Sequence, residues 1–250
     1  MSIKLPQGYD LIHLEEVDST MSEAARRAPS LSRATWILAD RQTQSRGRRG
    51  RAWRNFEGNF AATLILKPQC SAQQAAQRSF VAAVALYFAL RDLPGVTGLE
   101  LKWPNDVLLQ GQKVAGILLE STSKNADIVE WVTVGIGVNL VSAPDIRDLE
   151  DRAIAPISIV DAGGVAIPTT AFLEILAEHF AYWETQLTHF GFDTVRKSWL
   201  DHAARVGKKI TARTSSETLY GVFETIDADG NMILNTNGTQ RSIAAADVYF

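Results

Sequence analysis

The chain has 250 residues, of which 46% are hydrophobic and 21% charged, and its formal net charge at pH 7 is −3. This composition predicts a folded protein with a real core, and the length suggests one fair-sized domain with a small appendage. The acidic balance argues against nucleic-acid binding as the main activity. The longest apolar run, residues 80–90, is shorter than the roughly 20 residues that span a bilayer, and the first ten residues lack a signal peptide. We therefore expect a cytoplasmic protein with no membrane partner.

Cysteine and histidine offer little chemistry. The single cysteine, Cys70, has no partner for an internal disulfide, which fits a reducing compartment. The four histidines show no metal-ligand spacing, so no metal ligand is assigned from the sequence.

The first half of the chain alternates predicted strands and helices. Thr20 with Glu23 fits a capping box, which predicts a helix that opens at residues 19–20 and ends before Pro29. Ser71 with Gln74 fits a second capping box, which starts a long helix ending before Pro94. Predicted strands cover residues 11–17, 35–39, 60–66 and 99–103.

The second half continues this alternation. Residues 107–109 and 114–119 predict a hairpin around Gln110–Gly111. A strand over residues 128–138 is expected to end in a turn at its two glycines, and residues 156–162, 170–190 and 193–203 are expected to be helical. The pattern predicts an α/β (α+β) fold, with a mixed central sheet flanked by helices.

After residue 206 the pattern changes to short strands. These strands are expected at residues 208–213, 219–225, 231–235 and 241–243. Hairpin-type turns at Asp229–Gly230 and Asn237–Gly238 separate the later ones, which predicts a small β-barrel. We place the catalytic domain at residues 1–204 and the C-terminal β domain at residues 205–250.

The most distinctive segment is residues 45–54, named here the arginine loop. It holds five arginines within nine residues, interleaved with Gly47 and Gly50, and Trp53 precedes the last of them. Glycine lets the backbone approach a ligand closely, and the arginine fork matches phosphate and carboxylate. A solvated basic face and a nucleic-acid patch are the alternatives for such a run. Neither a Walker loop nor a Rossmann fingerprint occurs, so any phosphate grip has to come from elsewhere.

Three further motifs follow the arginine loop. They are Lys-Trp-Pro-Asn-Asp at residues 102–106, Lys-Val-Ala-Gly at 113–116 and Gly-Ile-Gly-Val-Asn at 135–139. In this order and at this spacing, the motifs resemble the catalytic domain of biotin–protein ligases over nearly the whole chain. The resemblance implies a class II synthetase-like ligase core with an SH3-like C-terminal module. The resemblance is to the type of biotin–protein ligase that lacks an N-terminal DNA-binding domain.

The resemblance also implies an activity. Such an enzyme uses ATP and Mg²⁺ to activate biotin as biotinyl-5′-AMP and transfers it to a lysine of a biotin carboxyl carrier domain. Arg48 and Lys113 are then the expected catalytic residues. The positions implied to bind biotin or its adenylate are Ser19, Thr20, Met21, Gln42, Arg46, Gly47, Arg48, Lys113 and Gly116. Trp53 and Asn139 are expected at the nucleotide, and Asp106 is expected to orient the arginine loop.

Several of these residues also have ordinary structural interpretations. Ser19 and Thr20 are natural N-cap residues, Gln42 reads as a surface glutamine, and Lys113 reads as a solvated strand-edge lysine. Two positions depart from the family pattern. Met21 stands where the family usually has asparagine, and Ser45 stands where it commonly has glycine.

Two rival functions remain to be weighed. A lipoate ligase or octanoyltransferase shares the fold class, but Cys70 is not in a motif that suits the catalytic cysteine of an octanoyltransferase. A DNA-binding regulator would need a helix-turn-helix domain, and only about ten residues precede the first predicted strand. We therefore expect no nucleic-acid partner.

Overall fold

The structure is a computed structural model that describes residues 3–54, 56–123, 128–148 and 154–250. A seven-stranded sheet with the order β1-β2-β3-β7-β6-β5-β4 forms its centre. The strands are β1 (Tyr9–Val17), β2 (Ala34–Gln42), β3 (Phe60–Leu66), β4 (Leu99–Lys102), β5 (Asp106–Leu109), β6 (Gln112–Ser123) and β7 (Val129–Val138). β1 and β2 run parallel, and every other neighbouring pair is antiparallel. The sheet is therefore mixed, as the sequence predicts.

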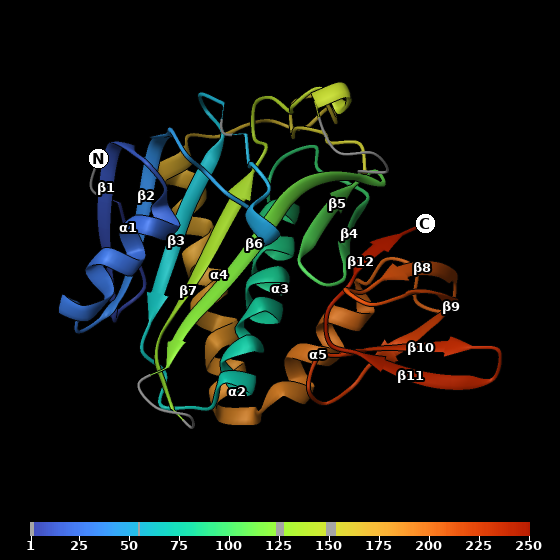
Figure 1. The fold of residues 1–250 in the computed structure, drawn as a ribbon. Coiled ribbons are helices and arrows are strands. Elements are labelled where there is room, and N and C mark those ends of the chain that lie inside the picture. The colour runs from blue at the N-terminus through green and yellow to red at the C-terminus, as the bar shows by residue number, and fades with distance from the viewer. Residues whose placement is uncertain (1–2, 55, 124–127, 149–153) are drawn as a thin grey trace.

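The helices lie on both faces of this sheet. They are α1 (Thr20–Arg27), α2 (Ala72–Ala76), α3 (Arg78–Arg91), α4 (Thr169–Phe190) and α5 (Phe192–Asp201), with short 3-10 turns η1 (Ala28–Ser30), η2 (Arg48–Gly50) and η3 (Ile146–Asp148). α3 and α4 cover one face, whereas α1 and η2 lie on the other (Figure 1). None of the described helices is long and apolar enough to cross a membrane.

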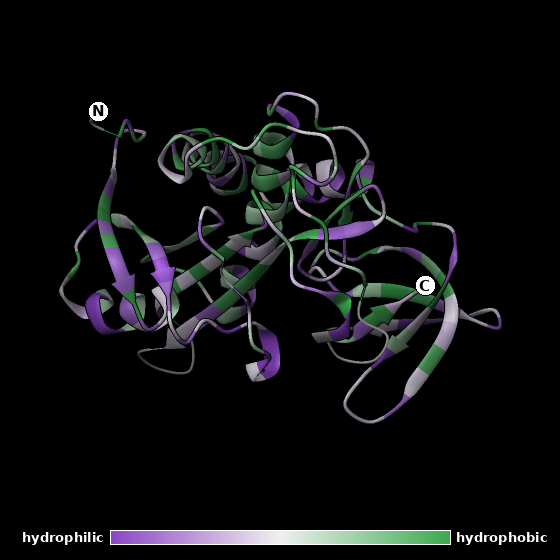
Figure 2. Cartoon of the chain, turned by 90° about the horizontal axis from the view of Figure 1, so that it is seen from above, coloured by the Kyte–Doolittle hydropathy of each residue, from purple (hydrophilic) through white to green (hydrophobic). Residues whose placement is uncertain are grey.

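The core lies between the sheet and α3 and α4. Trp36 packs edge-on against Phe180 of α4 with ring centroids 5.9 Å apart, and Phe60 packs against Phe172 at 4.9 Å. The apolar run at residues 80–90 forms most of α3 and is largely buried. In Figure 2 the strands and helices in the middle of the molecule are mainly green, which fits a core shared by the two layers.

The last five strands form an antiparallel sheet with the order β11-β10-β9-β8-β12. They are β8 (Lys209–Arg213), β9 (Thr218–Ile226), β10 (Met232–Thr236), β11 (Thr239–Ile243) and β12 (Asp247–Tyr249). Asn237 and Gly238 have positive φ angles in the β10–β11 turn, as that hairpin requires. The Trp103 indole N–H donates to the Gly230 carbonyl at 3.1 Å, so this sheet is fastened to the end of β4.

The predicted cap of α1 is wrong. Ser19, not Thr20, is the N-cap residue, and its side chain makes no capping hydrogen bond. Glu23 pairs with Arg26 and Arg27 instead of reaching back to the helix start. By contrast, the capping box of Ser71 and Gln74 is confirmed, although it opens only the short α2, after which α3 begins separately.

The predicted helix at residues 156–162 is also wrong. The Ile157 N–H donates to the Lys113 carbonyl at 3.0 Å, and the Lys113 N–H donates to the Ala155 carbonyl at 2.8 Å. This segment therefore runs extended beside the start of β6 and then turns at Ser158, whose hydroxyl accepts from the Asp161 N–H at 3.0 Å. Pairing with β6 satisfies its backbone better than one short helical turn would.

Candidate active site

A cavity of about 390 Å³ lies on the face of the sheet that carries α1 and η2. All twelve residues to which the sequence assigned a role line it: Ser19, Thr20, Met21, Gln42, Arg46, Gly47, Arg48, Trp53, Asp106, Lys113, Gly116 and Asn139. The fold brings them from α1, β2, the arginine loop and strands β5 to β7. The sequence missed a further wall, which consists of residues 246–249 around β12.

One end of the cavity is polar, and several of its side chains are hydrogen-bonded to one another. The Gln42 side-chain oxygen accepts from the Thr20 N–H at 2.8 Å and from the Thr20 hydroxyl at 3.1 Å. The Thr63 hydroxyl in turn donates to the Thr20 hydroxyl at 2.8 Å. The Ser19 hydroxyl has no hydrogen-bond partner among the described residues, although Ser19 is only 2% exposed. A hydroxyl that lines a cavity without a hydrogen-bond partner is ready to bond a polar ligand.

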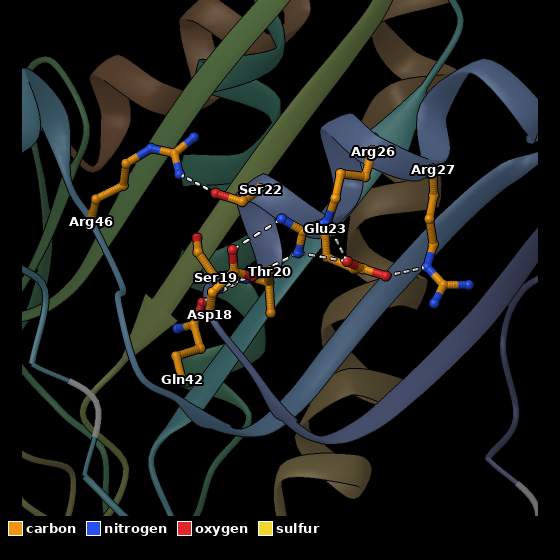
Figure 3. Close-up of polar contacts among 9 residues, drawn as sticks. All are labelled: Asp18, Ser19, Thr20, Ser22, Glu23, Arg26, Arg27, Gln42 and Arg46. Atoms are coloured by element: carbon orange, nitrogen blue, oxygen red, sulfur yellow. Dashed lines mark hydrogen bonds and ion pairs between the residues drawn. The ribbon is translucent and has the colours of Figure 1, made fainter.

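A network of charges fixes the start of α1 (Figure 3). Asp18 accepts from the Ser19 N–H at 2.7 Å and is held by both terminal nitrogens of Arg26, at 2.9 and 2.7 Å. These contacts lower the pKa of Asp18 to about 2, and the hydrogen bonds from Arg26 contribute most. Glu23 accepts from Arg26 and Arg27. Asp18 therefore holds the turn in place of the Ser19 side chain, which stays free.

Arg46 connects the arginine loop to two other elements. Its guanidinium donates to the Ser22 hydroxyl of α1 at 2.6 Å, which Figure 3 also shows, and pairs with Glu120 of β6 at 3.0 Å. The loop is closed on itself as well, because the Gly47 N–H donates to the Arg51 carbonyl at 2.7 Å. The Ser45 hydroxyl donates to the Trp53 carbonyl. Ser45, which departs from the family pattern, thus has a place in the loop's own hydrogen bonding.

The glycines of the third motif do not form a turn, which corrects the sequence prediction. Gly135 and Gly137 lie within β7, paired on both sides with β3 and β6. A Cβ atom at Gly137 would lie 2.5 to 2.8 Å from ring atoms of Trp53, and one at Gly116 would lie 3.1 Å from the same ring. These glycines are needed because the Trp53 indole rests directly on the sheet.

Three charged side chains meet beside this indole. Asp106 lies 2.6 Å from the Lys113 ammonium and 3.3 Å from that of Lys102. Burial alone would raise the pKa of Asp106, but the two lysines outweigh it and lower the pKa to about 2. Burial lowers the pKa of Lys102, and Asp106 opposes that shift. The Lys113 ammonium also lies 5.6 Å from the Trp53 ring centroid.

Among the described residues Asp106 pairs with these two lysines, whereas the arginine loop is held by other residues. Arg48 donates to the Asn105 side-chain oxygen at 3.1 Å, and burial lowers its pKa. Arg49 and Arg51 pair with Asp247 of β12 at 2.5 and 3.0 Å. Asp247 is only 11% exposed, and the sequence carried no signal for it, because neither β12 nor its approach to the loop was predicted.

Asn139 lies at the end of β7 and is 2% exposed. Its side-chain amide donates to the Ile157 carbonyl at 3.2 Å, and its backbone N–H donates to the Val114 carbonyl at 2.9 Å. The residue therefore holds the start of β6 and the extended segment after Ala155 against the cavity wall.

The site as a whole combines a polar, uncharged end with a strongly cationic region. The first holds Ser19, Thr20 and Gln42; the second holds the ammonium of Lys113 and the guanidinium of Arg48. Such a cavity suits a ligand with a neutral hydrogen-bonding head and an anionic tail, and the excess of fixed positive charge favours an anionic transition state.

Comparisons with known proteins identify the family of the chain. Residues 14–139 match the Biotin/lipoate A/B protein ligase family, and residues 206–250 match the family described as Biotin protein ligase C terminal domain. The fold is thus that of a protein ligase. The chain belongs to the biotin/lipoate A/B protein ligase family.

The relatives that it matches include one that is similar over nearly its full length. The "Biotin--[acetyl-CoA-carboxylase] ligase" of Paracoccus denitrificans is 49% identical over 95% of this chain and 99% of its own. The "Bifunctional ligase/repressor BirA" of Bacillus subtilis is 34% identical over 96% of this chain and 74% of its own. Among solved structures, the biotin protein ligase from Aquifex aeolicus in complex with biotin and ATP superposes with a TM-score of 0.79 at 25% identity, covering 96% and 97% of the two chains.

Proposed function

We propose that the protein is an ATP-dependent ligase that activates biotin as biotinyl-5′-AMP and transfers it to a lysine of a biotin carboxyl carrier domain. The observation that carries this proposal is the division of the cavity into a neutral polar end and a cationic region. Biotin has the same division, since its ureido ring is neutral and its valeryl chain ends in a carboxylate.

Ligand placement follows from this complementarity. The ureido ring occupies the polar end, where the free Ser19 hydroxyl and the first-turn N–H groups of α1 meet its carbonyl. The carboxylate then points toward Lys113 and Arg48. Trp53, resting on Gly137, forms an apolar wall beside the chain between them.

In the first step an oxygen of the biotin carboxylate forms a bond to the α-phosphorus of ATP. The bond from that phosphorus to the bridging oxygen breaks, and pyrophosphate leaves. Two anions must meet in this step, so Arg48 and Lys113 stabilise the charge that develops between them. Asp106 keeps the Lys113 ammonium beside the cavity through its 2.6 Å contact.

In the second step an acceptor lysine amine attacks the activated carbonyl. A C–N bond forms, the C–O bond to AMP breaks, and the amine loses a proton as AMP leaves. The mixed anhydride is prone to hydrolysis, so a loop that covers it and excludes water protects it. The arginine loop lies across the cavity and is anchored at both α1 and β12.

Mg²⁺ belongs to the proposal as the counter-ion that accompanies the phosphates of ATP. Magnesium commonly binds through substrate phosphates and one or two carboxylates, with water completing its shell. Among the described residues no group of three or more histidine, cysteine, aspartate or glutamate side chains is placed to hold a metal. Asp106 is a carboxylate of the cavity wall that fits a supporting role, and its present partners are lysines.

The proposed partners are biotin, ATP and a biotin carboxyl carrier domain of a carboxylase. The proposed location is the cytoplasm, where a lone, partly buried Cys70 stays reduced.

The test is pyrophosphate release from ATP with biotin or lipoate, each with and without a carrier domain. We expect biotin-dependent release, with mass spectrometry placing biotin on one carrier lysine. Lys113→Met should abolish release, whereas Lys197→Met, at an exposed lysine of α5, should not. Release with lipoate alone would reassign the substrate, and release with neither would refute the proposal.

A further inference from the structure

Met21 packs unusually closely against the sheet beneath it. It occupies the first turn of α1, directly after Thr20, and is 3% exposed. A Cβ atom built on Gly135 would lie 2.7 Å from the Met21 sulfur and 2.9 Å from its Cγ. Carbon atoms do not approach so closely, so the thioether occupies space that exists only because residue 135 is glycine.

The same strand carries a second contact of this kind. Gly135 and Gly137 are two residues apart on β7, so they face the same side of the sheet. Gly137 lies under the Trp53 indole, as Gly135 lies under Met21. The two side chains therefore stand next to each other along β7, with Met21 toward the polar end of the cavity and Trp53 toward Lys113.

We infer that Met21 is a specificity-determining residue: seated over Gly135, it forms the apolar inner wall of the subsite that takes the substrate's ring and sets the room in that subsite. This inference rests on the proposed function, since it concerns the ring of the same substrate. Polar contacts from Thr20 and Gln42 lie along the cavity beside this wall. The ring is thus bonded at its polar edge and packed against the thioether.

Both the strand beneath Met21 and the start of the helix that carries it are held in place. β7 is held in register by β3 and β6, where Gly135 pairs with Thr63 and Leu118. The start of α1 is held by the bond from the Thr20 N–H to Gln42 and by the clamp of Asp18. A Cβ at position 135 therefore displaces the flexible thioether into the cavity, where the ring binds, rather than displacing the strand or the helix.

The test compares the wild type with Gly135→Ala, Met21→Ala and the double variant. The dissociation constant for biotin is measured by calorimetry without ATP, at a temperature where circular dichroism shows all four folded. We expect Gly135→Ala to weaken biotin binding at least about tenfold, and Met21→Ala in the same chain to restore it to the value of Met21→Ala alone. The KM for ATP at saturating biotin should change less than about threefold.

Val134→Ala is the matched control, because Val134 is buried in the same strand but is absent from the cavity wall. It should lower the melting temperature without changing biotin affinity. Should Gly135→Ala fail to fold, Met21→Phe narrows the same subsite without touching β7 and should weaken biotin binding by a similar factor.

Two results would overturn the inference. One is unchanged biotin affinity in Gly135→Ala, which would make the pair ordinary core packing. The other is a double variant that binds biotin no better than Gly135→Ala. Failure of the proposed function gives a different result, because the wild type itself would then bind no biotin. If the wild type binds lipoate instead, the lipoate affinities of the same four proteins test whether Met21 forms the wall against the lipoate ring.

Discussion

Asp247 and Arg51 form an ion pair across 196 residues of sequence, with the guanidinium nitrogen 3.0 Å from the carboxylate oxygen. Arg49 lies 2.5 Å from the same oxygen, and Arg213 of β8 lies 3.7 Å away. Burial would raise the pKa of Asp247, but the hydrogen bond and charge of Arg51 together with Arg49 outweigh it, so the pKa is lowered. The C-terminal sheet therefore supplies the anion that holds the arginine loop over the cavity.

Replacing Asp247 with alanine should slow adenylate formation by about 100-fold, because a small misplacement of charged groups at a reacting centre costs about that much. The change releases Arg49 and Arg51 and thereby frees the neighbouring Arg48 to move. Pyrophosphate exchange at saturating ATP and biotin measures the effect. Glu217→Ala is the control, since it breaks another ion pair of the same sheet, to Arg241. Equal rates in the two variants would contradict this role of Asp247.

Replacing Arg48 with glycine should let the adenylate escape from the site. The half-buried guanidinium is bonded to Asn105 and lines the cavity, so its loss removes a cation that holds the phosphate. Free biotinyl-5′-AMP acylates exposed amines, so we expect biotin to appear on lysines of an unrelated protein added to the reaction. Mass spectrometry of that protein provides the measurement.

Arg41→Gly removes an exposed arginine that pairs with Glu16, away from the cavity, and should leave the adenylate retained. If the Arg48→Gly enzyme also confines biotin to the carrier lysine, then the guanidinium is not what retains the adenylate.

Local signals in the sequence were sufficient for much of this fold. Alternating apolar strands and two good hairpin turns have short-range causes, and β3 was predicted with the bounds that it has. The prediction failed where partners distant in sequence decide the structure. Residues 156–162 are extended because β6 pairs with them, and Thr20 bonds Gln42 rather than capping its own helix.

The same contrast between local signals and distant partners applies to the site. Arg48 and Lys113 stand in motifs, so a resemblance reaches them, and both line the cavity. Asp247 stands in no motif, and its role depends on a contact with Arg51, 196 positions earlier in the chain. A glycine in a sequence can indicate either a turn with a positive φ or a close approach of another group to the backbone. The sequence does not distinguish these two reasons, and Gly135 was expected in a turn. The structure shows the second.

The clamp between Asp18 and Arg26 predicts a selective effect on biotin. Arg26→Met removes both bonds to Asp18 and loosens the turn that presents the Ser19 hydroxyl. We expect the KM for biotin to rise about tenfold, equivalent to about 1.4 kcal/mol, with the KM for ATP little changed. Steady-state kinetics with each substrate varied in turn measures the difference.

Arg41→Met is the control for this clamp, because Arg41 forms an exposed pair with Glu16 between β1 and β2. A rise in both KM values, or a fall in melting temperature with unchanged kinetics, would mean that the clamp stabilises α1 without serving the ligand.

Asp106 predicts how stability depends on pH. Its pKa falls from the ordinary value of 3.8 to about 2, because Lys113 and Lys102 outweigh the effect of burial. A carboxyl whose pKa is lowered by folding stabilises the folded state above its unfolded pKa and loses that contribution as the pH falls through the folded pKa. The contribution of about 2 kcal/mol is therefore complete above about pH 5 and disappears between about pH 4 and pH 2.

Urea unfolding of the wild type and Asp106→Asn between pH 3 and pH 7 tests this. The variant should be less stable at pH 7, since it leaves two ammonium groups without their shared carboxylate, and the difference should shrink below about pH 4. Asp193→Asn, at a carboxylate that is 80% exposed, should show little difference at any of these pH values. A stability difference for Asp106→Asn that stays constant down to pH 3 would mean that the two lysines do not depend on the charge of Asp106.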